Sequence, residues 1–371
     1  MFSVSQFAPP MKRAPSAPVP AAVRALLRRW RAQRPLRAGS LLITIFGDAI
    51  APRGAAVTLG SLIRLAAPFG LTERLVRTSV ARLARHGWLA ARRSGRRSEY
   101  RLTRGGAERF AEATRRIYGQ SPEAWDGRWT LLVMPPRSAS RRRHSSEDLK
   151  WLGFGRLNPS LYAHPGCTPG EARRWLRNLP GPADGLLLEG RSADLAGDRR
   201  LVSHGWDLED LGRRYRHFVA AFAPVESALR AGAALPAGTA FVVRTLLIHE
   251  YRKIHLQDPL LPPPLLPRGW VGSAAYELCR RLYARVFAPA EGYLSATARR
   301  LHRPLPSANS AAYARFRGLV RTEPRSARST TRLAAPKRRI RLGILKGKIK
   351  VAEDFDAPLP EHVRVAFEGG D

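Results

Sequence analysis

Apolar residues recur at helical spacing early in the chain and predict short amphipathic helices. In SLLITIFGDAI, residues 40–50, they fall on one helical face and leave Asp48 on the polar side. TLGSLIRLAAPFG, residues 58–70, predicts a second helix that begins after the N-cap Thr58. We expect both helices to support the one that follows.

The third predicted helix begins at Thr72, which is a good N-cap. Glu73 lies in the first turn, where the helix dipole favours an acid, and Gly87 is suited to end the helix in the left-handed conformation. Its expected buried stripe consists of Leu75, Val76, Val80 and Leu83. The basic and small polar positions that we assign to DNA contact on this helix are Arg74, Arg77, Thr78, Ser79, Arg82 and Arg85.

A predicted hairpin follows this helix. WLAARRSGRRSEYRL, residues 88–102, has two strands around a glycine turn that carries four arginines, including Arg96 and Arg97. Thr103 is suited to cap a further helix. A helix, a sharp stop, a strand, a basic turn and a second strand form the layout of a winged helix-turn-helix with its recognition helix and wing.

The side-chain types in this segment favour DNA as the partner. Arginine binds guanine edges or phosphates through two parallel hydrogen bonds, and Thr78 and Ser79 are small enough to approach base edges. We expect Arg96 and Arg97 to contact phosphates or the minor groove, which adds affinity and salt dependence rather than sequence recognition. The alternative is a basic surface that contacts only solvent.

Strands alternate with helices after residue 120. WTLLVMP predicts a buried strand, GLLLEGR predicts another strand, and a further strand is expected near residues 157–163. This order predicts a small ferredoxin-like α+β domain over residues 121–206. Long amphipathic helices then predict a helical C-terminal module over residues 207–295.

The two ends of the chain are interpreted as irregular. Residues 1–37 are expected to be a basic mobile arm, although AAVRALLRRWRAQRPL could form a short helix. The apolar periodicity stops after Ser295, so residues 296–371 are expected to be a largely disordered basic tail. With a winged-helix domain at residues 38–120, the prediction is a multidomain α+β protein.

The charge of the chain agrees with a nucleic-acid partner. The chain has 371 residues and a formal net charge of +35 at pH 7. Polyanions attract such a chain, and nucleic acid is the commonest of them. Because a GC-rich genome would raise the arginine content everywhere, the positions of the arginines carry more information than their number.

Several classes of protein are disfavoured. Cys167 and Cys279 are far apart and lack metal-ligand spacing, so we expect neither a disulfide framework nor a metal site. No apolar run reaches the roughly 18 residues that a membrane span needs. We therefore expect a soluble, cytoplasmic protein that has no membrane partner.

The sequence offers little support for an enzyme. HEYRKIH, residues 249–255, places its histidines six apart rather than four, so it does not fit a zinc-protease helix, and a structural role is favoured for His249, Glu250 and Arg252. WTLLVMPP carries no carboxylate, which argues against a nuclease, although Asp126 lies just before it. We expect no catalytic residues and no cofactor.

The chain resembles the PaaX-type transcriptional repressors of bacterial phenylacetic acid catabolism between about residues 40 and 294. The segments that carry the resemblance are SLLITIFGDAI, ERLVRTSVARLARHGWL, GRRSEYRLT, WDGRWTLL, LKWLGFGRLNPSLYAHP and LIHEYRKIHLQDPLLPPPLLPRGW. It implies a winged-helix domain, a central domain similar to a CRISPR-associated nuclease fold and a helical C-terminal domain. It also implies a homodimer on a palindromic double-stranded operator, released by an aryl-acyl-CoA effector such as phenylacetyl-CoA.

The resemblance does not place the effector-binding residues, which stay unknown. An acyl-CoA needs cations for its phosphates and an apolar slot for its acyl group. Candidates that supply one or the other are Arg156, Arg213, Arg214, Arg244, Trp151, Phe154 and Trp206. Each of these types is more often surface charge or core, so none is assigned.

The end of the chain departs from this family. LGILKGKIKVAEDFDAPLPEHVRVAFEG, within residues 342–369, resembles the toxin-binding C-terminus of Phd/YefM-type antitoxins. A gene fusion or a frameshift would explain it. The alternative function is therefore an antitoxin-like protein whose tail binds a PIN-type toxin while its winged helix autoregulates transcription.

Overall fold

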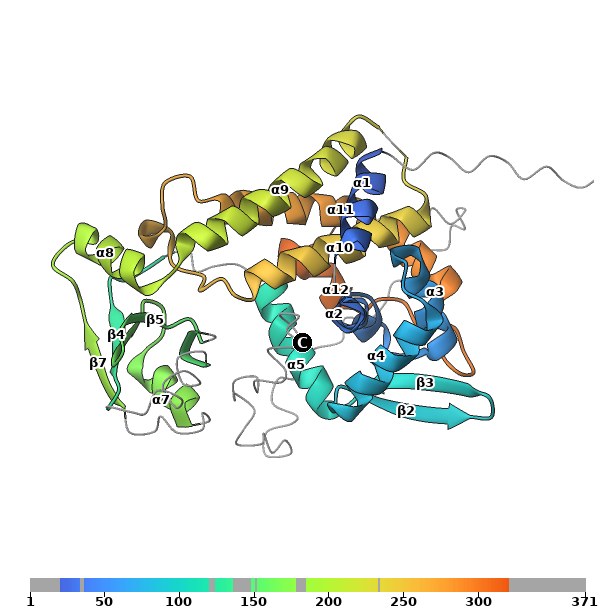
Figure 1. Cartoon of the computed structure of the whole chain (residues 1–371), viewed down its shortest axis with the longest axis horizontal. Helices are drawn as coiled ribbons and strands as arrows, with labels where there is room; N and C mark the ends of the chain where they lie inside the picture. Colours follow the sequence, from blue (N-terminus) through green and yellow to red (C-terminus); the bar gives the residue numbers. More distant parts are fainter. Residues whose placement is uncertain are drawn as a thin grey trace, which may run out of the picture.

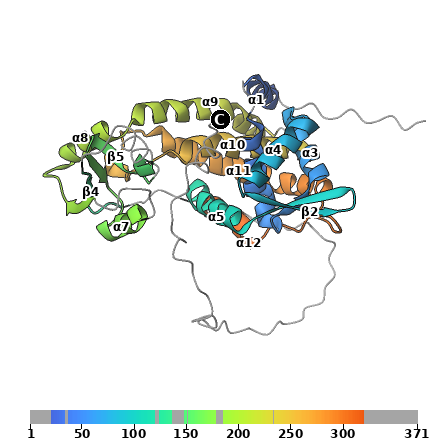
Figure 2. The same cartoon turned by 60° about the horizontal axis from the view of Figure 1, so that its bottom comes forward.

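A computed structural model describes residues 21–33, 37–119, 124–135, 148–150, 152–177, 185–232 and 234–319 (Figure 1). It is a mixed α+β structure with two antiparallel sheets among these residues. The central sheet lies beyond one end of the long helix α9 (Leu208–Arg230) (Figure 1). The hairpin of β2 (Leu89–Ser94) and β3 (Arg97–Leu102) lies on the far side of the molecule from this sheet in both views (Figures 1 and 2).

The N-terminal elements occur in the order that the sequence predicts, with additional short pieces. They are α2 (Ala38–Thr44), the π-helical turn η1 (Ile45–Ile50), the 3₁₀ turn η2 (Ala51–Arg53), β1 (Ala56–Thr58), α3 (Leu59–Ala66), the 3₁₀ turn η3 (Ala67–Phe69) and α4 (Glu73–Arg85). The N-caps predicted for α3 and α4 are confirmed. The Thr58 side chain accepts a hydrogen bond from the Ser61 amide, and Thr72 accepts one from the Leu75 amide.

The predicted hairpin consists of β2 (Leu89–Ser94) and β3 (Arg97–Leu102), and β1 pairs with β3 on the other side. Gly95 has a φ of +55°, so a glycine suits this tight turn. Helix α5 (Arg104–Tyr118) follows, capped by Thr103 as predicted. Gly106 in its first turn is required by space, since a Cβ there would lie 2.4 Å from the Trp88 carbonyl oxygen.

The central domain has one strand more than the sequence predicts. The single strand expected near residues 157–163 is a hairpin, because residues 159 and 160 turn the chain between two short strands. The elements are β4 (Trp129–Val133), β5 (Gly155–Asn158), β6 (Leu161–His164), α7 (Pro169–Arg177), β7 (Leu186–Gly190) and α8 (Leu195–Gly205). The sheet order β5-β6-β4-β7, antiparallel throughout, is that of a split βαβ arrangement.

The C-terminal part is helical and shares one core with the N-terminal part. Helix α9 is followed by α10 (Ala237–His255), the 3₁₀ turn η4 (Pro263–Leu265), α11 (Val271–Thr297), α12 (Ser310–Tyr313) and the 3₁₀ turn η5 (Arg315–Arg317). Helix α10 is buried over most of its surface, because α2, α9 and α11 pack against it. One cluster of buried apolar side chains runs from α1 through α4 and α5 to α11.

The interpretation of the N-terminal segment as a mobile arm is wrong for residues 21–33. Helix α1 (Ala21–Ala32) buries Val23, Leu26 and Trp30 and packs against α9. The alternative, a short basic helix, is what the structure contains. Its apolar residues recur at helical spacing, and their burial offsets the loss of chain entropy.

The expectation of disorder after Ser295 is wrong for residues 296–319. This stretch packs against the first part of the chain, and the Thr58 amide donates to the Arg299 carbonyl at 3.0 Å. Its structure is mostly irregular, which explains why it shows no apolar period. Residues 342–369, with the antitoxin-like peptide, lie outside the described residues.

Candidate nucleic-acid interface and its buried support

Helix α4 presents a basic, solvent-exposed face. Arg74, Arg77, Thr78, Arg82 and Arg85 are exposed or half-exposed on it, whereas the apolar stripe is turned inward toward α2 and α3. The Thr78 hydroxyl donates to the Arg74 carbonyl at 2.9 Å. The Arg77 guanidinium lies 2.6 Å from the Glu73 carboxylate, with both side chains more than half exposed. This exposed ion pair is weak, so Arg77 can exchange Glu73 for another anion at little cost.

Ser79 does not belong to this exposed face. From the sequence we predicted that it contacts DNA beside Thr78, but its exposure is only 4%. It lies next to Val80 on the side of α4 that packs into the core. The buried face of α4 extends beyond its apolar residues, so a small polar residue at the border of that face is buried as well.

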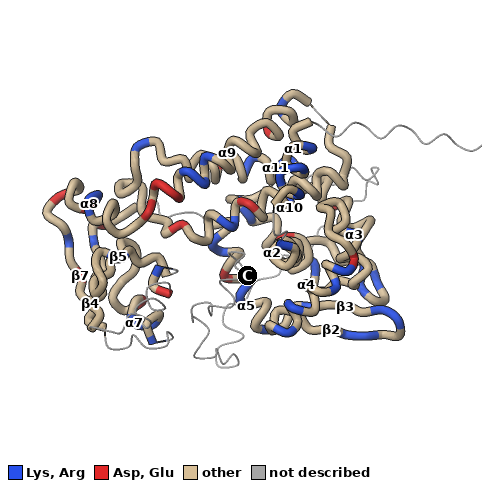
Figure 3. The backbone as a smooth tube through the Cα atoms, viewed as in Figure 1, with Lys and Arg blue, Asp and Glu red and all other residues tan. Residues whose placement is uncertain are grey.

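The hairpin β2–β3 adds a second basic surface. Arg92, Arg93, Arg96 and Arg97 are exposed around the turn, and Figure 3 shows positive charge along α4 and at the hairpin tip. The acidic residue of this hairpin, Glu99, is buried.

The Glu99 carboxylate is held by the C-terminal part of the chain. It accepts hydrogen bonds from the Leu301 amide at 3.1 Å and from the Arg300 guanidinium at 3.3 Å. Burial alone would raise its pKa, but these two donors outweigh burial and hold the pKa below its ordinary value. The hairpin is thus fixed, through the middle of β3, to residues that follow α11.

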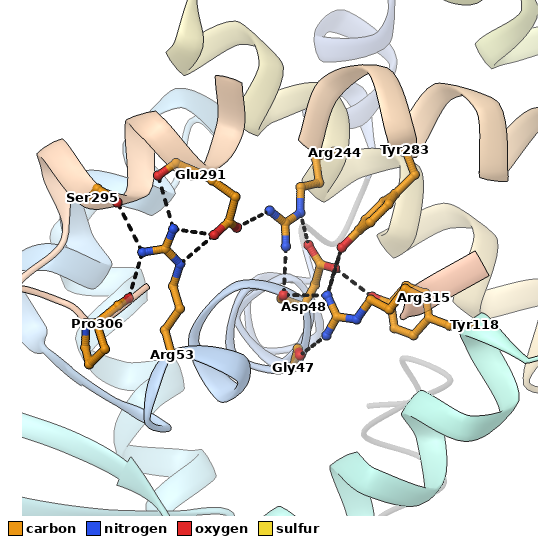
Figure 4. Close-up of polar contacts among 10 residues, drawn as sticks. All are labelled: Gly47, Asp48, Arg53, Tyr118, Arg244, Tyr283, Glu291, Ser295, Pro306 and Arg315. Atoms are coloured by element: carbon orange, nitrogen blue, oxygen red, sulfur yellow. Dashed lines mark hydrogen bonds and ion pairs between the residues drawn. The ribbon is translucent and has the colours of Figure 1, made fainter. Parts of the chain in front are cut away.

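Asp48 is the centre of a buried polar network, which corrects its predicted position on the polar side of a helix (Figure 4). Its carboxylate accepts hydrogen bonds from Arg244 at 2.7 Å and from Arg315 at 2.9 Å. The Tyr118 and Tyr283 hydroxyls donate to it at 2.6 and 2.7 Å. Burial acts to raise the pKa of Asp48, but the two guanidinium groups and the two hydroxyls together outweigh it and lower the pKa.

Glu291 on α11 extends this network to η2. Its carboxylate accepts from Arg244 at 2.6 Å and from Arg53 Nε at 3.0 Å. Arg53 also donates to the Pro306 carbonyl at 2.9 Å. The network therefore ties the turns between α2 and α3 to α10, α11 and the segment after α11.

A second polar contact joins α10 to α2. Arg252 donates to the Ser40 carbonyl at 2.9 Å and to the Thr44 hydroxyl at 2.8 Å, and His249 Nδ1 lies 3.0 Å from the same hydroxyl. Burial lowers the pKa of Arg252 to about 10 and holds the pKa of His249 well below its ordinary value. The structural role predicted for His249 and Arg252 is confirmed.

The structure brings together four of the candidates considered for an effector. Phe154, Arg156, Trp206 and Arg214 line a cavity of about 330 Å³ between the central domain and α9. Arg213 is not among its lining residues, and Arg244 is buried in the Asp48 network. The side chain of Trp151 lies outside the described residues.

Neither a metal centre nor a membrane span occurs in the part of the chain that the structure describes. There, no group of three or more histidine, cysteine, aspartate or glutamate side chains is placed to hold a metal ion. Within the same ranges, every helix is too short or too polar to cross a lipid bilayer.

The geometry defines a multidomain α+β protein that holds an exposed basic helix and hairpin on a buried ion-pair network. Three family models match successive parts of the chain: PaaX-like protein over residues 37–106, PaaX protein central Cas2-like domain over residues 122–202, and PaaX-like protein C-terminal domain over residues 206–296. The chain belongs to the PaaX-like family, which confirms the resemblance drawn from its sequence.

A characterised relative is the transcriptional repressor PaaX of Escherichia coli (strain K12). It is 36% identical to this chain over 290 residues, which cover 77% of this chain and 92% of that protein. The uncharacterized protein Rv0674 from Mycobacterium tuberculosis shares 22% identity over 62% of this chain and 89% of that one, with a TM-score of 0.42. A TM-score this low does not establish a shared fold or function.

Proposed function

We propose that this protein is a winged helix-turn-helix transcriptional repressor of phenylacetate catabolism that binds operator DNA as a homodimer and is released by an aryl-acyl-CoA such as phenylacetyl-CoA. The observation that carries the proposal is the basic face of α4 beside the basic β2–β3 hairpin. It occurs in a chain that is 36% identical to a transcriptional repressor. Such a protein acts on the nucleoid, in the cytoplasm.

In this proposal α4 enters the major groove of the operator. Arg74, Arg77 and Arg82 supply guanidinium groups for guanine edges or phosphates, and Thr78 approaches a base edge. Arg96 and Arg97 reach the neighbouring phosphates or minor groove, where they add affinity that falls with salt. A homodimer would place two copies of α4 on the half-sites of a palindrome.

A mobility-shift titration tests this proposal. The purified protein is titrated against the region upstream of the phenylacetate catabolic genes of its own genome and against unrelated DNA of equal length, with and without phenylacetyl-CoA. We expect preference for the first fragment and disappearance of the shifted band with the ligand. Equal affinity for both fragments would contradict the proposal.

A further inference from the structure

A half-open cavity of about 240 Å³ lies between α1, α9 and α10. Its floor is apolar and consists of Trp30, Phe218, Phe222 and Leu246, all of which are buried. An apolar cavity of about 150 Å³ is enough to bind benzene. This one therefore has room for an aromatic or short aliphatic acyl group.

The polar lining of the cavity consists of three cations, Gln33, His217 and one acid. Arg29 from α1, Arg214 from α9 and Lys253 from α10 are among its lining residues. The acid in the lining, Glu250, lies 3.5 Å from the Lys253 ammonium group and accepts a hydrogen bond from Gln33. An apolar floor beneath a lining with more cations than acids suits a ligand with an apolar head and an anionic remainder outside the cavity.

Trp30 connects this cavity to the start of α4. Its indole Nε1 donates to the Phe69 carbonyl at 3.1 Å, and the neighbouring Arg31 donates to the Pro68 carbonyl at 2.8 Å. Thr72, three residues after Phe69, caps α4. A ligand that displaces Trp30 therefore acts directly on the turn that positions the basic helix.

Trp30 also contacts His249, one of the residues on α10 that hold α2. Its ring meets the His249 ring edge-on, with centroids 5.0 Å apart, and His249 Nδ1 lies 3.0 Å from the Thr44 hydroxyl. One side chain in the floor of the cavity thus touches both the turn before α4 and the polar contact that holds α2. Ligand binding can change DNA affinity only if it favours one arrangement of these elements over another.

We propose that this cavity is a binding site for the apolar acyl group of an anionic acyl thioester, and that its occupancy repositions α4 through Trp30. The inference rests on the proposed repressor function and adds to it the place where the ligand binds. Helix α1 lies outside the residues that the family models match. Arg29 and Trp30 therefore lie outside the residues that the family models match.

Direct binding of phenylacetyl-CoA to the DNA-free full chain, measured by isothermal titration calorimetry, tests the site. Ala221→Phe on α9 fills the cavity, and Ala220→Phe is its matched control, since Ala220 is exposed and does not line the cavity. Arg29→Ala removes a cation from the polar lining, and Arg28→Ala is its control on the same helix. We expect Ala221→Phe to weaken binding at least about tenfold and Arg29→Ala about three- to tenfold, with both controls unchanged.

Each outcome of these binding measurements supports or contradicts the proposed binding site. Wild-type protein that does not bind phenylacetyl-CoA, or Ala221→Phe and Arg29→Ala variants that bind like their controls, would overturn it. Weakened binding in Arg156→Ala alone would place the ligand in the cavity beside the central domain instead. Because Arg29→Ala changes an exposed side chain, it keeps the test valid if Ala221→Phe does not fold. Operator binding without ligand is measured separately, so failure of the repressor function is distinguishable from failure of the site.

Discussion

Asp48 on η1 and Arg244 on α10 form a buried ion pair, with 2.7 Å between Asp48 Oδ2 and Arg244 Nε. The two residues are 196 positions apart in the chain. Arg315, farther along still, contacts the same carboxylate. This cluster joins the turn after α2 to the helical part of the protein, and α4 packs against α2. The basic face of α4 is therefore held by contacts with the C-terminal part of the chain.

Removal of the central carboxylate should strongly destabilise the fold. We expect Asp48→Ala to lower the free energy of unfolding by about 3–5 kcal/mol, because Arg244 and Arg315 would remain buried without their shared anion. Urea denaturation measures the change. Glu108→Ala is the control, since Glu108 forms an exposed pair with Arg104, and it should cost about 0.3–0.5 kcal/mol. A similar small decrease for both variants would show that the network does not support the fold.

A single arginine on α4 should carry a measurable share of operator affinity. We expect Arg77→Ala to weaken specific binding by about 1–3 kcal/mol, because it removes a guanidinium that pairs with a base edge or phosphate. Fluorescence anisotropy with operator DNA measures the change. Arg213→Ala on α9 is a matched control: Arg77 and Arg213 are 56% and 57% exposed, and each pairs with a carboxylate one turn away. Equal affinity of the Arg77 and Arg213 variants for operator DNA would show that Arg77 does not contribute to the interface.

The hairpin arginines should contribute charge rather than sequence recognition. We expect the double change Arg96→Ala and Arg97→Ala to weaken operator and unrelated DNA alike. It should also reduce the slope of log affinity against log salt by about 0.9 for each phosphate that the protein no longer neutralises. Ser79→Ala should leave this slope unchanged, because Ser79 is buried on the inner side of α4. A smaller slope for Ser79→Ala would mean that the serine reaches DNA after all.

Stability should decrease as the pH falls from about 6.5 to 4. Burial lowers the pKa of His164 and of His255 to about 4, below the ordinary 6.5 expected in the unfolded chain. Between these values the unfolded state binds more protons, so each histidine reduces stability by about 1.4 kcal/mol per pH unit as the pH falls. The full contribution of each histidine is present above pH 6.5. Urea denaturation at pH 7, 6 and 5 measures the slope.

A substitution at His255 separates its contribution to the pH dependence of stability from that of the other histidines. His255 Nε2 lies 3.0 Å from the Arg116 carbonyl and Nδ1 lies 3.1 Å from the Tyr251 hydroxyl, contacts that a neutral ring satisfies. His255→Gln should reduce the slope of stability against pH between pH 6.5 and 5 by about 1.4 kcal/mol per pH unit, and leave the part that His164 and His249 contribute. Asp48 does not interfere, since its lowered pKa places its effect on stability below this range. An unchanged slope would show that His255 is protonated in the folded protein.

The basic helix and hairpin could be predicted from sequence because their signals are local. Thr72 caps α4 from the adjacent position, the apolar stripe repeats within the helix, and Gly95 marks the turn. The Asp48 network could not be predicted, since the two arginines that contact Asp48 lie about two hundred positions or more away and no local pattern pairs them with it. The sequence does not show whether a polar residue at the border of an apolar stripe is buried or exposed. In the structure, Ser79 lies on the buried side.

The errors at the two ends have different causes. Val23, Leu26 and Trp30 recur at spacings of three and four, so the signal for α1 was present but obscured by the many arginines and prolines around it. Residues 298–319 had no such signal, because irregular backbone that packs through single side chains such as Phe316 leaves no period. Both segments are held by contacts distant in sequence.

Genomic footprinting, carried out with and without phenylacetyl-CoA, tests the proposed repressor function most directly. We predict protection of a palindromic site upstream of genes for aryl-acid catabolism, and disappearance of that protection when phenylacetyl-CoA is present. Protection confined to unrelated promoters, or protection that the ligand leaves unchanged, would contradict this function.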